Sequence, residues 1–362
     1  MQRTPITFYP GPAKIYPQIA QFWYEAYQEG ILSINHRSSE FEQIYQKVVV
    51  GFRQKLNLPS NYHLFFVSSA TECWQIIAQS YKNLAFLHFF CGSFGEKWYK
   101  VSQQIPDRQA SETDFVCWGF NQPLSLEILK NYKKIPQLIA FCQNETANGT
   151  CVSFEIIAHV HQKFPEALIA LDLTSSLGGV SIDWQHTDIA FASVQKCLGL
   201  PAGLAVLICS PKAIEKAQVL GQRNYYNNIL NLYENAQKWQ TTHTPNVMNI
   251  FLLSKVLEIL PNILQTQAML EVRATDLYNF FETHPLFQPL ITAKSNRSAT
   301  VIAITALQEK NIEKSRILAK SQNIILGKGY GGLKNSTFRI ANFPQIDAQE
   351  IALLKDFFAN FS

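Results

Sequence analysis

A lysine and an aspartate stand where two apolar, strand-like runs of this chain end. Lys196 follows the run 189–194, and Asp172, 24 positions earlier in the chain, follows the run 167–171. A lysine amine can form a Schiff base with an aldehyde cofactor, and a buried carboxylate can keep the ring nitrogen of such a cofactor protonated. The pair therefore suggests a pyridoxal phosphate site, with Lys196 and Asp172 as its catalytic residues.

Each of these two residues also has an ordinary interpretation. Most lysines are solvated, and Asp172 could form an Asx-turn or a helix cap with Thr174 and Ser175. A position between apolar segments would instead disfavour the charged form of Lys196 and make its amine available. A carboxylate in the same surroundings needs a hydrogen-bonding or cationic partner, and a pyridinium N–H would serve as one.

Three further segments carry groups that suit the same cofactor. The turn Ser68-Ser69-Ala70-Thr71 separates a strand from a helix, so its free N–H groups and the helix dipole can bind a phosphate. Phe94, beside two glycines, can lie flat on a planar ring. Thr146 follows a strand and can donate to a ring oxygen. Each segment has an ordinary alternative: 68–71 could simply begin a helix, Phe94 could pack in the core, and Thr146 could form a turn.

Three basic residues suit an anionic substrate. Arg339 is the only charge in the strand-like run 336–341. Its planar guanidinium can bind a carboxylate through two parallel hydrogen bonds. His36 and Arg37 are adjacent and suit an anionic substrate tail. For each arginine, a structural salt bridge is the alternative.

Composition narrows the class of protein. The chain has 362 residues, of which 47% are hydrophobic and 16% charged, and its net charge is +4. That balance suits a large interior and a buried subunit interface, and no dense basic run predicts a nucleic-acid partner. Seven scattered cysteines without a C-x-x-C pair, no signal-peptide core and no apolar run of ~20 residues predict a cytoplasmic protein that is not in a membrane.

Strand-like and helix-like segments alternate through most of the chain. This alternation predicts an α/β domain with a mostly parallel sheet flanked by helices, its functional groups at strand ends. We expect an N-terminal arm at 1–15, a large domain at 16–260 and a smaller α+β domain at 261–362.

The hydrophobic pattern also predicts individual elements. The expected strands are 63–67, 84–90, 137–142, 167–171, 189–194, 204–209, 298–304 and 337–341. The expected helices include 41–56, 72–81 and a region 247–281 broken at Pro261. A capping box at Asp347 and Glu350 begins the last helix.

These segments, in this order, resemble the class V, fold-type I aminotransferases, which use pyridoxal phosphate, and among them most closely the phosphoserine aminotransferases. The resemblance covers nearly the whole chain. FYPGPA at 8–13 is similar to F-x-x-G-P-A, SINHRSSEF at 33–41 to S-x-x-H-R-x-x-E-F, CQNET at 142–146 to C-x-N-E-T, DLTS at 172–175 to D-x-S-S, and QKCLGLPAGL at 195–204 to Q-K-N-x-G-P-A-G-L with one extra residue.

The resemblance implies a role for each site residue. Lys196 would hold the cofactor as a Schiff base, Asp172 would contact the ring nitrogen, and Thr146 would contact the ring hydroxyl. Phe94 stands where the family has a stacking tryptophan. Gln195 and the backbone of Ala70 and Thr71 would bind the cofactor phosphate, and Arg339 the substrate α-carboxylate.

The resemblance also implies a homodimer with composite active sites. His243 and Thr244 match an N-T-P segment that reaches the cofactor phosphate of the neighbouring subunit, with His243 where asparagine is common. His36 and Arg37 would bind substrate across the same interface. No metal is expected in such a site.

The implied reaction transfers the amino group of L-glutamate to 3-phosphohydroxypyruvate, giving O-phospho-L-serine and 2-oxoglutarate, a step of serine biosynthesis. Two departures bear on it: 68–71 has neither glycine nor arginine, and GYGGLK at 329–334 replaces a second His-Arg pair. Lys328 or Lys334 could supply the missing cation. The alternative is a class V aminotransferase of another specificity, such as alanine/serine–glyoxylate. A cysteine desulfurase fits less well because Phe94 stands where that family has histidine, and a homologue without turnover would not need Lys196, Asp172 and Arg339.

Overall fold

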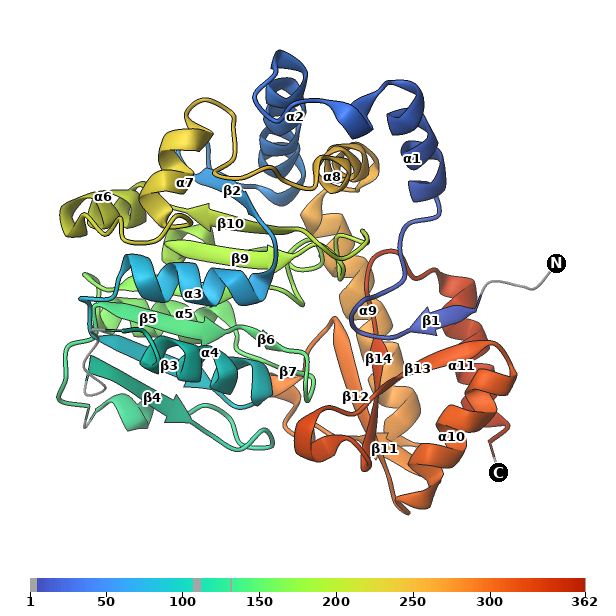
Figure 1. Ribbon diagram of the computed structural model, residues 1–362. Coiled ribbons are helices and arrows are strands. Elements are labelled where there is room, and N and C mark those ends of the chain that lie inside the picture. Colours follow the sequence, from blue (N-terminus) through green and yellow to red (C-terminus); the bar gives the residue numbers. More distant parts are fainter. Residues whose placement is uncertain (1–4, 107–111, 131, 362) are drawn as a thin grey trace.

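A computed structural model describes residues 5–106, 112–130 and 132–361 of the chain. Its strands form a seven-stranded sheet and a five-stranded sheet, which lie side by side in Figure 1. A two-stranded hairpin, β6 (Asn144–Glu145) with β7 (Thr150–Cys151), lies between them. Short 3-10 helices are η1 (Ile31–Ser33), η3 (Leu126–Leu129), η4 (Trp184–His186), η5 (Lys294–Asn296) and η6 (Gly331–Leu333).

The large sheet is parallel except at β10. Its strand order is β2-β10-β9-β8-β5-β3-β4, and β10 runs antiparallel to both of its neighbours. The turn 194–204 joins β9 directly to β10, and so short a connection can join only antiparallel strands. Lys196 lies in this turn. The strands are β2 (His63–Val67), β3 (Phe86–Phe90), β4 (Thr113–Cys117), β5 (Leu138–Cys142), β8 (Leu168–Asp172), β9 (Ile189–Ser193) and β10 (Ala205–Cys209).

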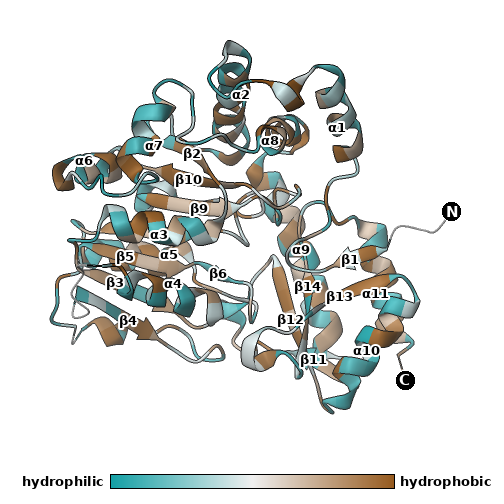
Figure 2. Ribbon diagram, viewed as in Figure 1, coloured by the Kyte–Doolittle hydropathy of each residue, from teal (hydrophilic) through white to brown (hydrophobic). Residues whose placement is uncertain are grey.

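The inner strands of the large sheet are buried on both faces, which explains why β5, β8, β9 and β10 are almost entirely apolar, whereas the edge strand β4 leaves Phe115 and Cys117 exposed. In β9, Ile189 and Phe191 join one hydrophobic cluster, whereas Ala190 and Ala192 join the cluster on the opposite face. Figure 2 shows hydrophobic colour along these strands and mixed colour on the surrounding helices. Helices α3 (Ala70–Ser80), α4 (Ser93–Gln103), α6 (Pro211–Leu220) and α7 (Ile229–Ala236) contribute to one cluster, and α1 (Ile19–Gln28), α2 (Ser39–Leu56), α5 (Phe154–Lys163) and α8 (Val247–Ile259) to the other.

The small sheet combines the two ends of the chain. The N-terminal strand β1 pairs parallel with β13, so the arm that the sequence predicts as extended forms an edge strand. The other neighbouring strands pair antiparallel. The elements are β1 (Ile6–Phe8), β11 (Phe287–Pro289), β12 (Val301–Ala306), β13 (Ile324–Lys328), β14 (Thr337–Ala341), α9 (Ile263–Glu282), α10 (Lys310–Ser321) and α11 (Ala348–Ala359).

The expected α/β architecture is confirmed, with a mostly parallel large sheet and a second, C-terminal mixed sheet. All eight expected strands are present, with ends that shift by up to three residues, and the helix expected from 72 begins at Ala70. Strands β1, β4, β6, β7, β11 and β13 are additional to that expectation. The domain boundaries at 15 and 260 stay a prediction.

The apolar region 247–281 forms two helices that are separated at Pro261, as the sequence predicts. Helix α8 ends at Ile259 and α9 begins at Ile263, because Pro261 has no N–H to donate and Asn262 caps the second helix. Within the described residues, no single helix is long and apolar enough to cross a membrane. Only the pair α8–α9 passes such a test of length and composition, and it is bent by 82°.

We expect Asp347→Ala to lower the free energy of unfolding by about 1 kcal/mol, the usual contribution of a helix N-cap. The Asp347 side chain accepts from the N–H of Glu350, and the Glu350 carboxylate accepts from the N–H of Asp347, as the sequence predicts. Urea denaturation followed by circular dichroism measures the change. Gln349→Ala, an exposed change in the same turn, is the control, and equal stability of the two variants would contradict the role of the cap.

Candidate active site

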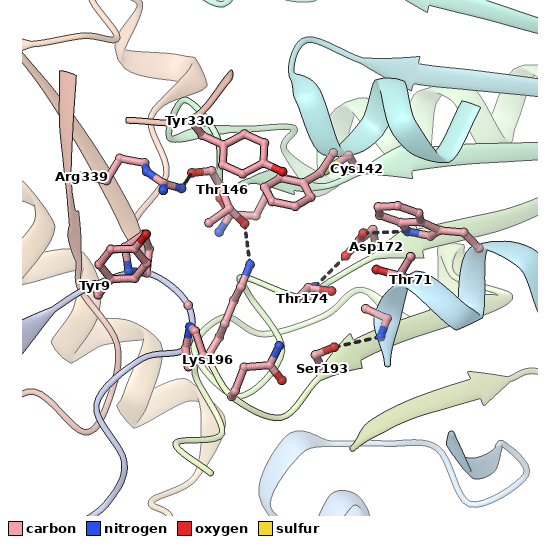
Figure 3. A pocket seen from close by; sticks show the side chains of 18 residues that line it. Tyr9, Thr71, Cys142, Thr146, Asp172, Thr174, Ser193, Lys196, Tyr330 and Arg339 are labelled. Carbon is pink, nitrogen blue, oxygen red and sulfur yellow. Dashed lines mark hydrogen bonds between the residues drawn. The ribbon is translucent and has the colours of Figure 1, made fainter. Parts of the chain in front are cut away.

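A pocket of about 240 Å³ lies where the large sheet, the N-terminal arm and the small sheet meet. The carboxyl ends of parallel strands β5 and β8 open into it, as expected for an α/β sheet. In Figure 3, Arg339 and Tyr9 lie at one side of the pocket, Asp172 and Thr71 at the other, and Lys196 between them. Eight predicted site residues line it: Ala70, Thr71, Phe94, Thr146, Asp172, Gln195, Lys196 and Arg339.

Lys196 is buried, and its amine faces hydroxyl groups. The side chain is only 7% exposed, so the interpretation of a solvated lysine is wrong. Its Nζ donates to Thr146 Oγ1 at 2.6 Å and to Ser175 Oγ at 2.9 Å. Burial lowers the pKa of the amine, and the nearby Asp172 charge opposes that effect. The structure thus presents an amine that is held in place and easier to deprotonate than a free lysine.

The N-terminal arm fixes the turn that carries Lys196. Gln345 Nε2 donates to the carbonyl of Lys196 at 2.9 Å and to the carbonyl of Lys14 at 2.7 Å. Gly11 has φ +149°, and a Cβ atom there would lie 3.1 Å from Lys196 Cε. Only glycine suits that backbone conformation, and it lets the arm pack directly against the lysine stem.

Asp172 ends β8 and points its carboxylate into the pocket. Its Oδ1 accepts from the N–H of Thr174 at 2.9 Å, so the Asx-turn considered from the sequence is formed. Its Oδ2 accepts from Trp74 Nε1 at 3.2 Å, from the first turns of α3. Burial raises the pKa of the carboxyl, and the Thr174 hydrogen bond opposes that effect. A cationic N–H donor in the pocket would stabilise the ionised form.

The start of α3 offers donors for an anion. Ser69 caps the helix by accepting from the N–H of Glu72, and the N–H of Ser68 donates to the Glu72 carboxylate. The N–H of Ala70 donates to Ser193 Oγ at 2.8 Å, across the pocket wall. Gln195 Oε1 is buried and has no hydrogen-bond partner within the described residues. Thr71, Ser193 and Gln195 line the pocket there, and their hydroxyl and amide N–H donors, with the positive end of the helix dipole, can hold a phosphate.

Phe94 is positioned by a buried carboxylate. Glu145 Oε2 accepts from the N–H of Phe94 at 3.0 Å and from the N–H of Gly95 at 3.2 Å, so Glu145 caps α4 from the neighbouring hairpin. Burial raises the pKa of Glu145. A Cβ atom on Gly92 would lie 2.3 Å from the Glu145 side chain, so only glycine fits there. The Phe94 ring centroid lies 5.5 Å from Lys196 Nζ.

Arg339 projects from the middle of β14 and is buried. Its Nε donates to the carbonyl of Lys328 at 2.7 Å, and its Nη1 to the carbonyl of Thr146 at 2.8 Å. Burial lowers the pKa of the guanidinium. The arginine is therefore held by backbone carbonyls rather than by a salt bridge, and it keeps donor capacity for a carboxylate.

Four predicted site residues lie outside this pocket: His36, Arg37, His243 and Thr244. Arg37 Nη1 donates to Gln240 Oε1 at 3.0 Å. The pKa of His36 is lowered, first by burial and then by the charges of Arg37 and His243. His36, Arg37 and His243 therefore form a separate group, which one chain does not bring to Lys196.

Several residues of the site escaped the sequence analysis. Trp74, Ser175 and Glu145 hold Asp172, Lys196 and Phe94 through contacts between distant segments. Ser175 and Glu145 carried a signal, because they belong to the DLTS and CQNET motifs. Ser193 and Tyr330 also line the pocket.

The sequence model of the family "Aminotransferase class-V" matches residues 10–340. The chain belongs to this family. It is a pyridoxal-phosphate-dependent aminotransferase that resembles the phosphoserine aminotransferases.

Individual relatives agree with that assignment. The phosphoserine aminotransferase of Rhodococcus opacus (strain B4) is 24% identical over 355 residues, which cover 95% of this chain and 91% of that protein. A crystal structure of a phosphoserine aminotransferase from Cytophaga hutchinsonii superposes with a TM-score of 0.91 at 31% identity, covering 99% of both chains. An alanine–glyoxylate aminotransferase from Nostoc sp. shares the fold, with a TM-score of 0.80 at 19% identity, covering 99% of this chain and 95% of that one.

We expect Lys196→Met to abolish turnover and yet to stabilise the cofactor-free protein at pH 7. The loss of turnover should reach roughly 10²–10⁴-fold or more, the usual contribution of a positioned acid–base group. The buried amine is removed, while the hydroxyls of Thr146 and Ser175 keep each other as partners at 2.5 Å. Urea midpoints of the two cofactor-free proteins measure the stability.

The pH dependence provides the control. Because the native pKa of Lys196 is lowered, the unfolded chain binds more protons between that pKa and the ~10.4 of a free lysine. The free energy of unfolding of the wild type should therefore rise with pH in that window, and the advantage of Lys196→Met should shrink. A less stable variant at pH 7, with a difference that does not change with pH, would contradict this account.

Proposed function

We propose that the pocket binds pyridoxal phosphate and carries out transamination. Three features of this chain suit that cofactor: a buried amine that donates to two hydroxyls, a buried carboxylate that accepts from two N–H groups, and the start of α3 facing the same pocket. Lys196 would bind the aldehyde carbon, Asp172 the ring nitrogen and Thr146 the ring hydroxyl. The phosphate would contact Gln195 and the backbone of Ala70 and Thr71, and Phe94 would stack on the ring.

The chemistry follows from these positions. When bound, pyridoxal phosphate supplies an aldehyde that condenses with amines and a ring that withdraws electrons from the substrate α-carbon. Arg339 orients the substrate through its α-carboxylate. The Lys196 amine, with its pKa lowered, would take and return a proton at the substrate α-carbon. Asp172 would place its carboxylate opposite the ring nitrogen and would thereby favour the protonated, electron-withdrawing form of the ring.

The amino donor and acceptor that we propose are L-glutamate and 3-phosphohydroxypyruvate, which give 2-oxoglutarate and O-phospho-L-serine for serine biosynthesis. One observation carries this choice: the likeness over 99% of the chain to a phosphoserine aminotransferase, at 31% identity. We also propose that the enzyme works in the reducing cytoplasm. All seven cysteines are free thiols, which supports that location.

A second candidate acceptor is glyoxylate, with alanine or serine as donor. The specific observation in its favour is Tyr330, which lines the pocket from the segment 329–334 that replaces a His-Arg pair. Lys328 and Lys334 are exposed and do not line the pocket of the described chain, so neither supplies a cation for a phosphate there. A small, uncharged substrate side chain would suit that arrangement.

Half-reactions separate the two candidates. We expect L-glutamate and O-phospho-L-serine to bleach the visible absorbance of the lysine-bound cofactor, and alanine and serine to act at least roughly tenfold more slowly per unit concentration, a difference of about 1.4 kcal/mol. Stopped-flow absorbance with each amino acid in turn measures these rates. Faster bleaching by alanine or serine than by O-phospho-L-serine would move the assignment to glyoxylate.

The active form that we propose is a homodimer with composite sites. Helix α1 exposes Trp23, Tyr24 and Tyr27, a concentration of aromatic surface that is unusual outside an interface. The group of His36, Arg37, His243 and Thr244 lies outside the pocket of its own chain. In a two-fold symmetric pair, such a group can complete the pocket of the other subunit.

Complementation tests this assembly. Lys196→Ala and Arg37→Ala should each give an inactive or weakly active protein. After the two are unfolded together and refolded, random pairing should restore roughly one functional site in four, because one site of each mixed dimer then carries neither change. Activity of the mixture and its mass by light scattering are the measurements. A dimer without recovered activity would show that Arg37 serves the pocket of its own chain, and a monomer would end the proposal.

A further inference from the structure

Tyr330 lines the pocket beside Phe94, the residue that would stack on the cofactor. Its ring is stacked on that of Phe94, with centroids 4.8 Å apart and planes 25° apart. In Figure 3, Tyr330 lies across the pocket from Lys196, whose Nζ is 5.5 Å from the Phe94 centroid. Phe94 belongs to α4 of the large sheet, whereas Tyr330 follows β13 of the small sheet. The two rings therefore join the two halves of the pocket.

Several contacts fix the Tyr330 ring. Lys97 Nζ donates to its hydroxyl at 2.6 Å and lies 5.0 Å from its ring centroid. Gly331 has φ +56°, and a Cβ atom there would lie 3.1 Å from Ser93 Oγ at the start of α4. A Cβ atom on Gly329 would lie 2.0 Å from a backbone carbonyl. The glycines on either side thus allow a tight turn that brings Tyr330 against α4.

The same turn supports the carboxylate-binding arginine. The carbonyl of Lys328, two residues before Tyr330, accepts from Arg339 Nε at 2.7 Å. The guanidinium carbon of Arg339 also lies 5.7 Å from the Tyr330 ring centroid. A shift of Arg339 on binding a carboxylate would therefore reach Tyr330 and, through it, Phe94.

We propose that Tyr330 is a positioning residue, which holds Phe94 flat over the cofactor ring and is itself oriented by Lys97. A phenylalanine has less stacking area than the tryptophan of the family pattern, and Phe94 is only partly buried. A second aromatic layer restricts the ring to the stacked orientation. This inference rests on the proposed cofactor site, and it is independent of which keto acid the enzyme aminates.

The test uses holoenzyme without substrate. Tyr330→Leu removes the outer ring, and it should weaken the induced circular dichroism of the bound cofactor and speed cofactor dissociation by roughly 2- to 10-fold, the range that one aromatic pair supplies. Tyr330→Phe keeps the ring but loses the Lys97 hydrogen bond, so it should have a smaller effect, which Lys97→Met should match. Lys100→Met, an exposed change one turn further along α4, is the control.

A double-mutant cycle identifies the route of the effect. If Tyr330 acts through Phe94, then Tyr330→Leu should change cofactor dissociation little in a Phe94→Leu background, and the two effects should not add. Additive effects would overturn the proposal, as would an unchanged spectrum and dissociation rate in Tyr330→Leu with a raised KM, which would mark a substrate contact. If Tyr330→Leu does not fold, the rate of cofactor dissociation from Tyr330→Phe and from Lys97→Met is the deciding measurement. Wild-type rates in both variants would reject the positioning role of Tyr330. Wild-type protein that binds no cofactor would instead contradict the proposed function.

Discussion

The site depends on an amine that is buried without a carboxylate partner. Placing an ammonium in a protein interior is costly, and the hydroxyls of Thr146 and Ser175 compensate only in part because they also serve the neutral amine. The pKa of Lys196 falls for that reason. Asp172 lies in the same pocket, but its carboxylate oxygens accept hydrogen bonds from Trp74 and Thr174. If it formed an ion pair with Lys196, the amine would be charged and no longer a nucleophile.

Much of the remaining structure holds that amine in place. The turn 194–204 returns the chain between two buried strands, and Gln345 fastens its backbone to the arm. The carbonyl of Thr146 receives Arg339 from the small sheet, while the hydroxyl of the same residue receives Lys196. One threonine therefore connects the group that would bind substrate with the group that would do the chemistry. A displacement of one sheet relative to the other would therefore change the positions of both Arg339 and Lys196.

The sequence predicted site residues best where they stand at the end of a strand. Lys196 and Asp172 could be found because parallel strands buried on both faces are continuous apolar runs, and the polar residue that ends each run is conspicuous. Trp74 and Glu145 could not be found in this way. Each acts through a hydrogen bond to a segment that is distant in the chain, so the CQNET motif marks Glu145 but does not reveal that it caps α4. Strand β1 was missed for a related reason, since its partner β13 lies at the other end of the sequence.

The arrangement separates chemistry from selectivity. The residues that would contact the cofactor lie at the end of β8, after β9, in the hairpin after β5 or at the starts of α3 and α4, and the large sheet positions all of these elements. Those that would contact the substrate come from the small sheet, its turn 329–334 and a group outside the pocket of its own chain. Changes in the second set leave Lys196 and Asp172 in place, and they reach the first set through the contact of Tyr330 with Phe94. Departure from the family pattern at 329–334 would therefore bear on the keto acid that is accepted and on the support of Phe94, whereas the proton transfer would depend on Lys196, which the turn does not contain.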